Sequence, residues 1–201
     1  RPVVVTGGGT GGHLFPMRAI ADAWARHRPD VPVYFVGSDR GQDKVVLADR
    51  SEPLVLLGGR GIRRSLSLRA MVSNVGAVAG ILGAVIGSLV RCVRWRPLAV
   101  VSVGGYASLP AVLAARRLGV PVVVVSYDRR PGRASRLAAR RAAACAVAFP
   151  GSDLPRSVHT GAPIRRVIRS VDRLRDQVDA KRRLGVDPGR FLVAVMGGSL
   201  G

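Results

Sequence analysis

Short apolar runs alternate with longer mixed segments along most of the chain. An apolar run bounded by turn residues is typical of a strand buried on both faces, and apolar positions three or four residues apart are typical of a helix. We predict strands at residues 3–6, 33–36, 54–57, 98–103, 120–126 and 146–149. We predict helices at residues 17–27, 42–49, 66–94, 108–118 and 135–144. This alternation predicts an α/β fold, a Rossmann-like parallel sheet with helices on both faces.

The pattern changes after residue 163. A charged helix is predicted at 172–184, and a new strand at 191–196 leads into another glycine loop. We therefore place residues 1–163 in one domain, and residues 164–201 in a linker and the start of a second domain. We expect the chain to be part of a longer protein, because a domain rarely stops at such a loop.

The glycine-rich segment Gly7–Gly12 joins the first predicted strand to the first predicted helix. Glycines let the backbone turn sharply and approach a ligand closely. A helix start offers free N–H groups and a positive dipole end, which suit a phosphate, and Pro16 fits the first turn of a helix. His13 lies at the same edge and can transfer protons near neutral pH.

Ligands of parallel α/β sheets bind at the carboxyl ends of the strands. Three loops that contain glycine fall at such ends, at residues 7–13, 104–106 and 127–132. Three loops at one edge predict a binding site there more strongly than any one of them.

Two other interpretations of the first loop stay open. The spacing Gly7-x-Gly9-x-x-Gly12 also satisfies the dinucleotide fingerprint, which requires an acidic residue about 20 positions further on. Asp39 is the available acid, although it lies late. The segment could also be a tight turn without a ligand, with His13 a solvated loop residue.

The chain is strongly basic, with a formal net charge of +20, and 30 of its 32 basic residues are arginine. Nucleic acid is not the expected partner, because aromatic residues make up only 4% and no nucleic-acid-binding signature is present. Two explanations remain, namely a GC-rich coding sequence and attraction to an anionic membrane surface.

Metal and disulfide chemistry have no support in the sequence. Cys92 and Cys145 lack the spacing of a metal site, so we predict free thiols in a reducing compartment. No Asp-x-Asp motif and no signal peptide are visible. We expect neither a metal nor another cofactor.

No residue between Arg69 and Arg91 is charged, which gives an apolar stretch long enough to span a bilayer. Glycine, serine and asparagine interrupt it and lower its hydrophobicity. Three alternatives stay open: a packed helix with a membrane-contacting end, an ordinary core helix, and a true span.

Several motifs, in order along the chain, resemble the MurG-like N-acetylglucosaminyltransferases of glycosyltransferase family 28. They are Gly8–Pro16, Ser102–Ser108, Gly119–Val123, Ala148–Gly151, Gly161–Arg165 and Gly197–Gly201. The resemblance implies the two-domain GT-B fold, with this chain as the N-terminal, acceptor-binding domain. It also implies an inverting enzyme of peptidoglycan synthesis. Such an enzyme moves N-acetylglucosamine from a UDP-sugar donor to a lipid-linked muramyl-pentapeptide, as a peripheral protein on the cytoplasmic face of the cell membrane.

The resemblance also assigns site residues. It makes His13 the catalytic base or an acceptor contact. Acceptor and diphosphate binding falls to Thr10, Gly11, Gly12, Gly104, Gly105, Tyr106 and Asp128. Donor binding falls to Arg165 and Ser199, and membrane contact to Arg60, Arg63, Arg64 and Arg69.

The chain departs from the family in two segments. The family's Asn-Pro-Val-Arg is replaced by Ala162-Pro163-Ile164-Arg165. The family's His-Glu-Gln-Asn is replaced by Val125-Ser126-Tyr127-Asp128, and the arginines Arg129, Arg130 and Arg133 follow. The carboxylate at position 126 is lost, and Asp128 is the candidate to compensate. A relative that acts on another lipid or natural-product acceptor, an inactive paralogue, a non-catalytic membrane-surface module and an NAD(P)-binding protein stay open as alternatives.

Overall fold

The computed structural model describes residues 1–58 and 68–195, with side chains described for 1–58 and 79–195. The chain divides into two compact units, Arg1–Pro163 and Ile164–Gly201. This division falls where the sequence analysis places a domain boundary. That the second unit begins a nucleotide-sugar domain stays a prediction.

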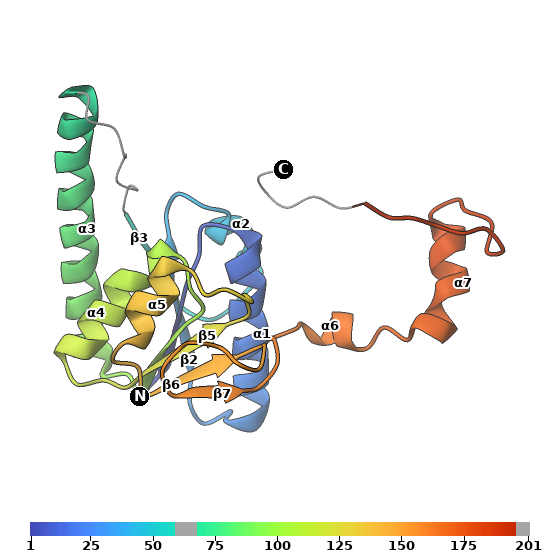
Figure 1. Cartoon of the computed structure of the whole chain (residues 1–201). Helices are drawn as coiled ribbons and strands as arrows, with labels where there is room; N and C mark the ends of the chain where they lie inside the picture. Colours follow the sequence, from blue (N-terminus) through green and yellow to red (C-terminus); the bar gives the residue numbers. More distant parts are fainter. Residues whose placement is uncertain (59–67, 196–201) are drawn as a thin grey trace. The chain divides into compact units, whose positions relative to one another are not determined.

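The first unit is built on a seven-stranded sheet in the order β3-β2-β1-β4-β5-β6-β7 (Figure 1). Every pair of neighbouring strands in it is parallel. The strands are β1 (Val3–Thr6), β2 (Val33–Ser38), β3 (Leu54–Leu57), β4 (Ala99–Ser102), β5 (Val122–Ser126), β6 (Ala144–Val147) and β7 (Ser157–His159). The predicted Rossmann-like parallel sheet is confirmed.

Helices cover both faces of the sheet, as predicted (Figure 1). In the first unit they are α1 (Gly11–His27), α2 (Asp43–Val46), α3 (Leu68–Trp95), the 3-10 turn η1 (Tyr106–Ser108), α4 (Leu109–Arg117) and α5 (Arg133–Ala139). Alternate strand residues point to opposite faces. Val4 and Val100 therefore pack with α3, α4 and α5, whereas Val5 and Val101 pack with α1 and the end of α2.

The predicted start of the first helix was wrong. The helix begins at Gly11, with Thr10 as the N-cap residue, and Pro16 lies inside it. The start of this helix was hard to predict, because glycine disfavours helix interiors and proline is favoured in a first turn. His13 therefore belongs to the first turn of α1 and not to a loop.

Other predicted elements also differ from the structure. Strand β6 and helix α5 begin and end earlier than predicted, so that Cys145 lies on a strand. The short strand β7 was not predicted. The strand predicted at 191–196 was wrong for residues 191–195, which have no regular structure, and Met196 lies outside the described residues. A strand needs a partner for its backbone, and the described part of the second unit contains only helices α6 (Arg166–Arg169) and α7 (Arg173–Arg183).

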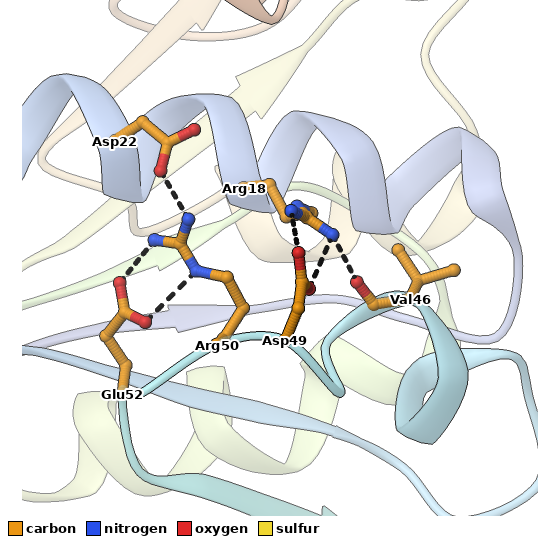
Figure 2. Close-up of polar contacts among 6 residues, drawn as sticks. All are labelled: Arg18, Asp22, Val46, Asp49, Arg50 and Glu52. Atoms are coloured by element: carbon orange, nitrogen blue, oxygen red, sulfur yellow. Dashed lines mark hydrogen bonds and ion pairs between the residues drawn. The ribbon is translucent and has the colours of Figure 1, made fainter.

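Ion pairs fasten α1 to the segment between α2 and β3 (Figure 2). Arg18 makes a two-bond contact with Asp49, at 2.9 and 2.7 Å, and also donates to the carbonyl of Val46. Further along the helix, Asp22 accepts from Arg50, whose guanidinium also binds Glu52. These contacts hold the helix that carries His13.

Among the described residues, no helix is long and apolar enough to cross a membrane. Helix α3 covers the predicted apolar stretch. It packs against α4 and contributes Ala84 to the core. The predicted free thiols are also confirmed, since Cys92 and Cys145 are both unpaired and buried.

Candidate active site

The first two glycine loops meet where β1 and β4 end side by side. Thr6 of β1 pairs with Ser102 of β4, so the loops that follow them start together. A Cβ at Gly7 would lie only 2.4 Å from a methyl group of Val103. Glycine at this position therefore lets the two loops approach closely.

The His13 imidazole lies against the turn made by Gly104 and Gly105. A Cβ at Gly104 would lie 3.5 Å from Nε2, and a Cβ at Gly105 would lie 3.5 Å from Nδ1. Both glycines have positive φ angles, +93° and +76°, which favour glycine. The missing side chain at Gly104 leaves space beside Nε2.

His13 has the electrostatics of a base. Burial lowers its pKa below the ordinary value, and the charges of Asp128 and Asp43 oppose this shift. The imidazole is therefore neutral at pH 7. Thr10 Oγ1 lies 3.2 Å from Nδ1, so the threonine can accept the Nδ1 proton and leave Nε2 free to take another.

The start of α1 is suited to an anion. Within the described residues, the backbone N–H groups of Gly11 and Gly12 have no hydrogen-bond partner, and the first turn holds no acidic residue. Free N–H groups at a helix N-terminus attract negative charge. The structure thus brings Thr10, Gly11, Gly12 and His13 together with the second glycine loop.

The sequence analysis missed the buried carboxylate of Asp43. It accepts hydrogen bonds from the backbone N–H groups of Gly9, at 2.9 Å, and Ser38, at 2.8 Å. A Cβ at Gly8 or Gly37 would lie within 2.3 Å of Oδ1, so glycine at both positions makes room for it. Asp43 holds the first glycine loop against the end of β2. The only signal was an acid in the first turn of a short predicted helix.

The segment Val125-Ser126-Tyr127-Asp128, which differs from the family pattern, lies at the end of β5, next to β4. Ser126 is buried, and its hydroxyl has no partner among the described residues, so it presents no ligand-facing group in place of a carboxylate. Tyr127 lies beside His13, with ring centroids 6.5 Å apart. Asp128 is exposed and close enough to raise the pKa of His13. Compensation by Asp128 stays a prediction.

For the remaining predicted residues, the structure either shows no role in the site or does not describe the residue. Tyr106 begins η1 directly after the second glycine loop and is 69% exposed. Arg165 precedes α6 in the second unit. Arg69 lies in the first turn of α3, with its side chain not described. Outside the described residues lie Arg60, Arg63, Arg64 and Ser199.

The acid proposed for dinucleotide binding does not contact the glycine loop. Asp39 forms a loose ion pair with Arg40, at 3.9 Å, and its side chain is 43% exposed. The carboxylate that does bind this loop is Asp43, which is fully buried.

A Rossmann-like sheet with a histidine and two glycine loops at its carboxyl edge has the features that suit a phosphorylated ligand. The sequence profile of the glycosyltransferase family 28 N-terminal domain matches residues 3–147. The chain belongs to this family.

Curated relatives match almost the whole chain. One from Streptomyces coelicolor is 38% identical over 199 residues, which cover 99% of this chain and 54% of the relative. Another from Nocardioides is 36% identical and covers 99% and 53%. Both are named UDP-N-acetylglucosamine–N-acetylmuramyl-(pentapeptide) pyrophosphoryl-undecaprenol N-acetylglucosamine transferase. The chain spans about half the length of the curated relatives it matches.

Solved structures agree on the fold. Acinetobacter baumannii MurG has a TM-score of 0.67 and 27% identity, and the match covers 81% of this chain and 46% of that protein. A Staphylococcus aureus MnaA structure with UDP has a TM-score of 0.56, with 81% and 46% covered, but only 14% identity. The second likeness shows the fold alone.

Proposed function

We propose that the full-length protein transfers N-acetylglucosamine from UDP-N-acetylglucosamine to a lipid-linked muramyl-pentapeptide. The observation that carries the proposal is the half-buried His13, held between two glycine loops in a family 28 domain, where burial lowers its pKa. The names of the relatives that match 99% of the chain supply the substrates.

We assign each step of the proposed sugar transfer to the group whose charge or free N–H suits it. The acceptor hydroxyl attacks the anomeric carbon, UDP leaves from the opposite side, and His13 Nε2 takes the hydroxyl proton as the new bond forms. The free N–H groups of Gly11 and Gly12 bind the acceptor diphosphate. We propose that Asp128, Tyr106 and Thr10 orient the acceptor. Arg165 and Ser199 are proposed to contact the donor.

The test measures UDP release by the full-length protein with this donor and a short-chain lipid-linked acceptor. Release that requires the acceptor supports the proposal, and a folded protein that binds the donor without release contradicts it. His13→Ala should lower turnover by about 10² to 10⁴-fold without loss of folding. His27→Ala is the matched control, because His27 lies at the other end of the same helix.

We further propose that this protein binds the cytoplasmic face of the membrane peripherally. In support, α3 carries four apolar side chains that are each more than half exposed, at the helical spacing of one face: Leu82, Ile86, Val90 and Val93. Such a face suits a membrane interface, and arginines attract anionic lipid. Arg60, Arg63, Arg64 and Arg69 are the proposed arginines.

A second candidate is sugar transfer to a different acceptor. The exposed arginines Arg129, Arg130 and Arg133 follow β5 in the sequence, and none of them has an ion-pair partner among the described residues. They would favour an acceptor with an additional anionic group. Donor binding without transfer to the muramyl-pentapeptide would favour this candidate.

A further inference from the structure

Pro16 leaves a gap in the hydrogen bonding of α1. In an α-helix, the N–H of residue 16 would donate to the carbonyl of residue 12, but proline has no N–H. The Gly12 carbonyl, one residue before His13, therefore lacks its usual helical donor four residues on. An unpaired carbonyl weakens the first turn of the helix at the position where the candidate base is attached.

Tyr127 supplies the missing donor from another element. Its hydroxyl oxygen lies 2.8 Å from the Gly12 carbonyl oxygen and 3.1 Å from that of Val103 (Tyr127 to Gly12 spans 115 positions of sequence). A hydroxyl has one proton, and the shorter distance favours Gly12. The tyrosine thus joins the first turn of α1 to the ends of β4 and β5.

The environment keeps this hydroxyl a donor. Burial, and secondarily the charge of Asp128, raises the pKa of Tyr127 far above the ordinary value. The phenol stays protonated at every pH at which a sugar transferase works. The ring of Tyr127 also lies beside His13, with the two ring planes inclined at 56°.

We propose that Tyr127 is a positioning residue, which replaces the helix hydrogen bond that Pro16 removes and so fixes His13 against the second glycine loop. The inference rests on the proposed function for its catalytic consequence. Its structural part, the dependence of His13 on the Tyr127 hydroxyl, does not require activity.

The test is a double-mutant cycle in the full-length protein. Tyr127→Phe keeps the ring and removes the donor, whereas Pro16→Ala gives α1 its own N–H at that position. Tyr127→Phe should lower kcat/KM for the acceptor by roughly tenfold to a hundredfold, because small displacements of a catalytic group are costly. The loss should shrink to about threefold or less in the Pro16→Ala background, where the helix bonds Gly12 itself.

A second readout separates positioning from activity. We expect NMR titration of the imidazole to show a higher pKa of His13 in Tyr127→Phe, because a loosened turn lets water reach the ring. This rise should be absent with Pro16→Ala. Tyr34→Phe is the matched control, since the Tyr34 hydroxyl has no hydrogen-bond partner among the described residues and its ring packs on Trp95.

Two results overturn the inference: equal losses in both backgrounds, or a Tyr127→Phe variant whose kcat/KM and His13 titration match the wild type. If the wild-type protein transfers no sugar, the proposed function fails. The titration of His13 in the four proteins of the cycle then still decides whether Tyr127 positions it.

Discussion

At the scale of single residues, the charge of His13 controls the expected pH dependence. Burial lowers the pKa of His13, so the neutral base persists at pH values where an ordinary histidine would be protonated. Protonation abolishes the base, and we therefore expect kcat/KM for the acceptor to fall on an acid limb below pH 6.5, the ordinary histidine pKa. A pH–rate profile of the full-length protein measures this limb.

Asp128 should shift that limb in a known direction. Its negative charge raises the pKa of His13, so Asp128→Asn should move the acid limb to lower pH. Asp39→Asn is the control, because the charges that shift the pKa of His13 are those of Asp128 and Asp43. A limb that moves to higher pH in Asp128→Asn would contradict this account of the site.

Asp43 supports the first glycine loop through two backbone hydrogen bonds. Asn in its place keeps one acceptor oxygen and turns the other toward the loop as an NH₂ donor, which leaves the N–H of Gly9 or Ser38 without a partner. We expect Asp43→Asn to lower the free energy of unfolding by about 1–3 kcal/mol. Urea unfolding measures the change, and an unaltered midpoint would contradict the role of Asp43.

The sequence identified His13 but not Asp43, for a physical reason. A histidine after a glycine-rich turn is a local signal. The role of Asp43 depends on its contacts with Gly8 and Gly9, more than thirty residues away, and those contacts exist only once β1 and β2 pair. The bond between Tyr127 and Gly12 was unpredictable in the same way, because it requires the sheet.

At the scale of elements, the ion pairs of Figure 2 brace α1. The Arg50 side chain is only 16% exposed and serves both Asp22 and Glu52. Arg50→Met should destabilise the fold by about 2 kcal/mol, because it leaves two partly buried carboxylates without their cation. The thermal midpoint should fall by roughly 4–8 °C. Arg28→Met, which breaks the exposed pair with Asp30, should leave the midpoint near that of the wild type.

The exposed apolar face of α3 predicts how the protein binds lipid. Replacing Ile86 and Val90 together with Gln should weaken binding to vesicles of anionic phospholipid roughly tenfold, because the apolar area that enters the interface is lost. Val45→Gln is the control, since Val45 is even more exposed than Ile86 and Val90 but lies on α2, over the other face of the sheet. Vesicle sedimentation that detects no difference between the two variants would contradict the proposed contact.

Elements were predictable where the core imposes a pattern. Residues 3–6 and 54–57 were predicted to the residue, because both are short runs rich in apolar residues between turn residues. The strand Ser157–His159 was missed because all three of its side chains are exposed and carry no such pattern. Residues 191–195 have the pattern of a strand, but pattern alone does not supply a pairing partner.

At the scale of the whole molecule, both core clusters draw only on residues between Val3 and Leu154. The second unit buries no side chain among its described residues, and Phe191 and Val195 are each 92% exposed. Stability follows the buried apolar area, so residues 1–163 should contain all that this chain needs to fold.

We therefore predict that residues 1–163, produced alone, unfold in one cooperative thermal transition with the same midpoint as residues 1–201. The shorter chain should also bind less of a dye that reports exposed apolar surface, because it lacks the side chains of the second unit. Circular dichroism and dye fluorescence measure the two effects. A midpoint lower by several degrees would mean that residues 164–201 stabilise the sheet, and the boundary after Pro163 would then not mark the end of a folding unit.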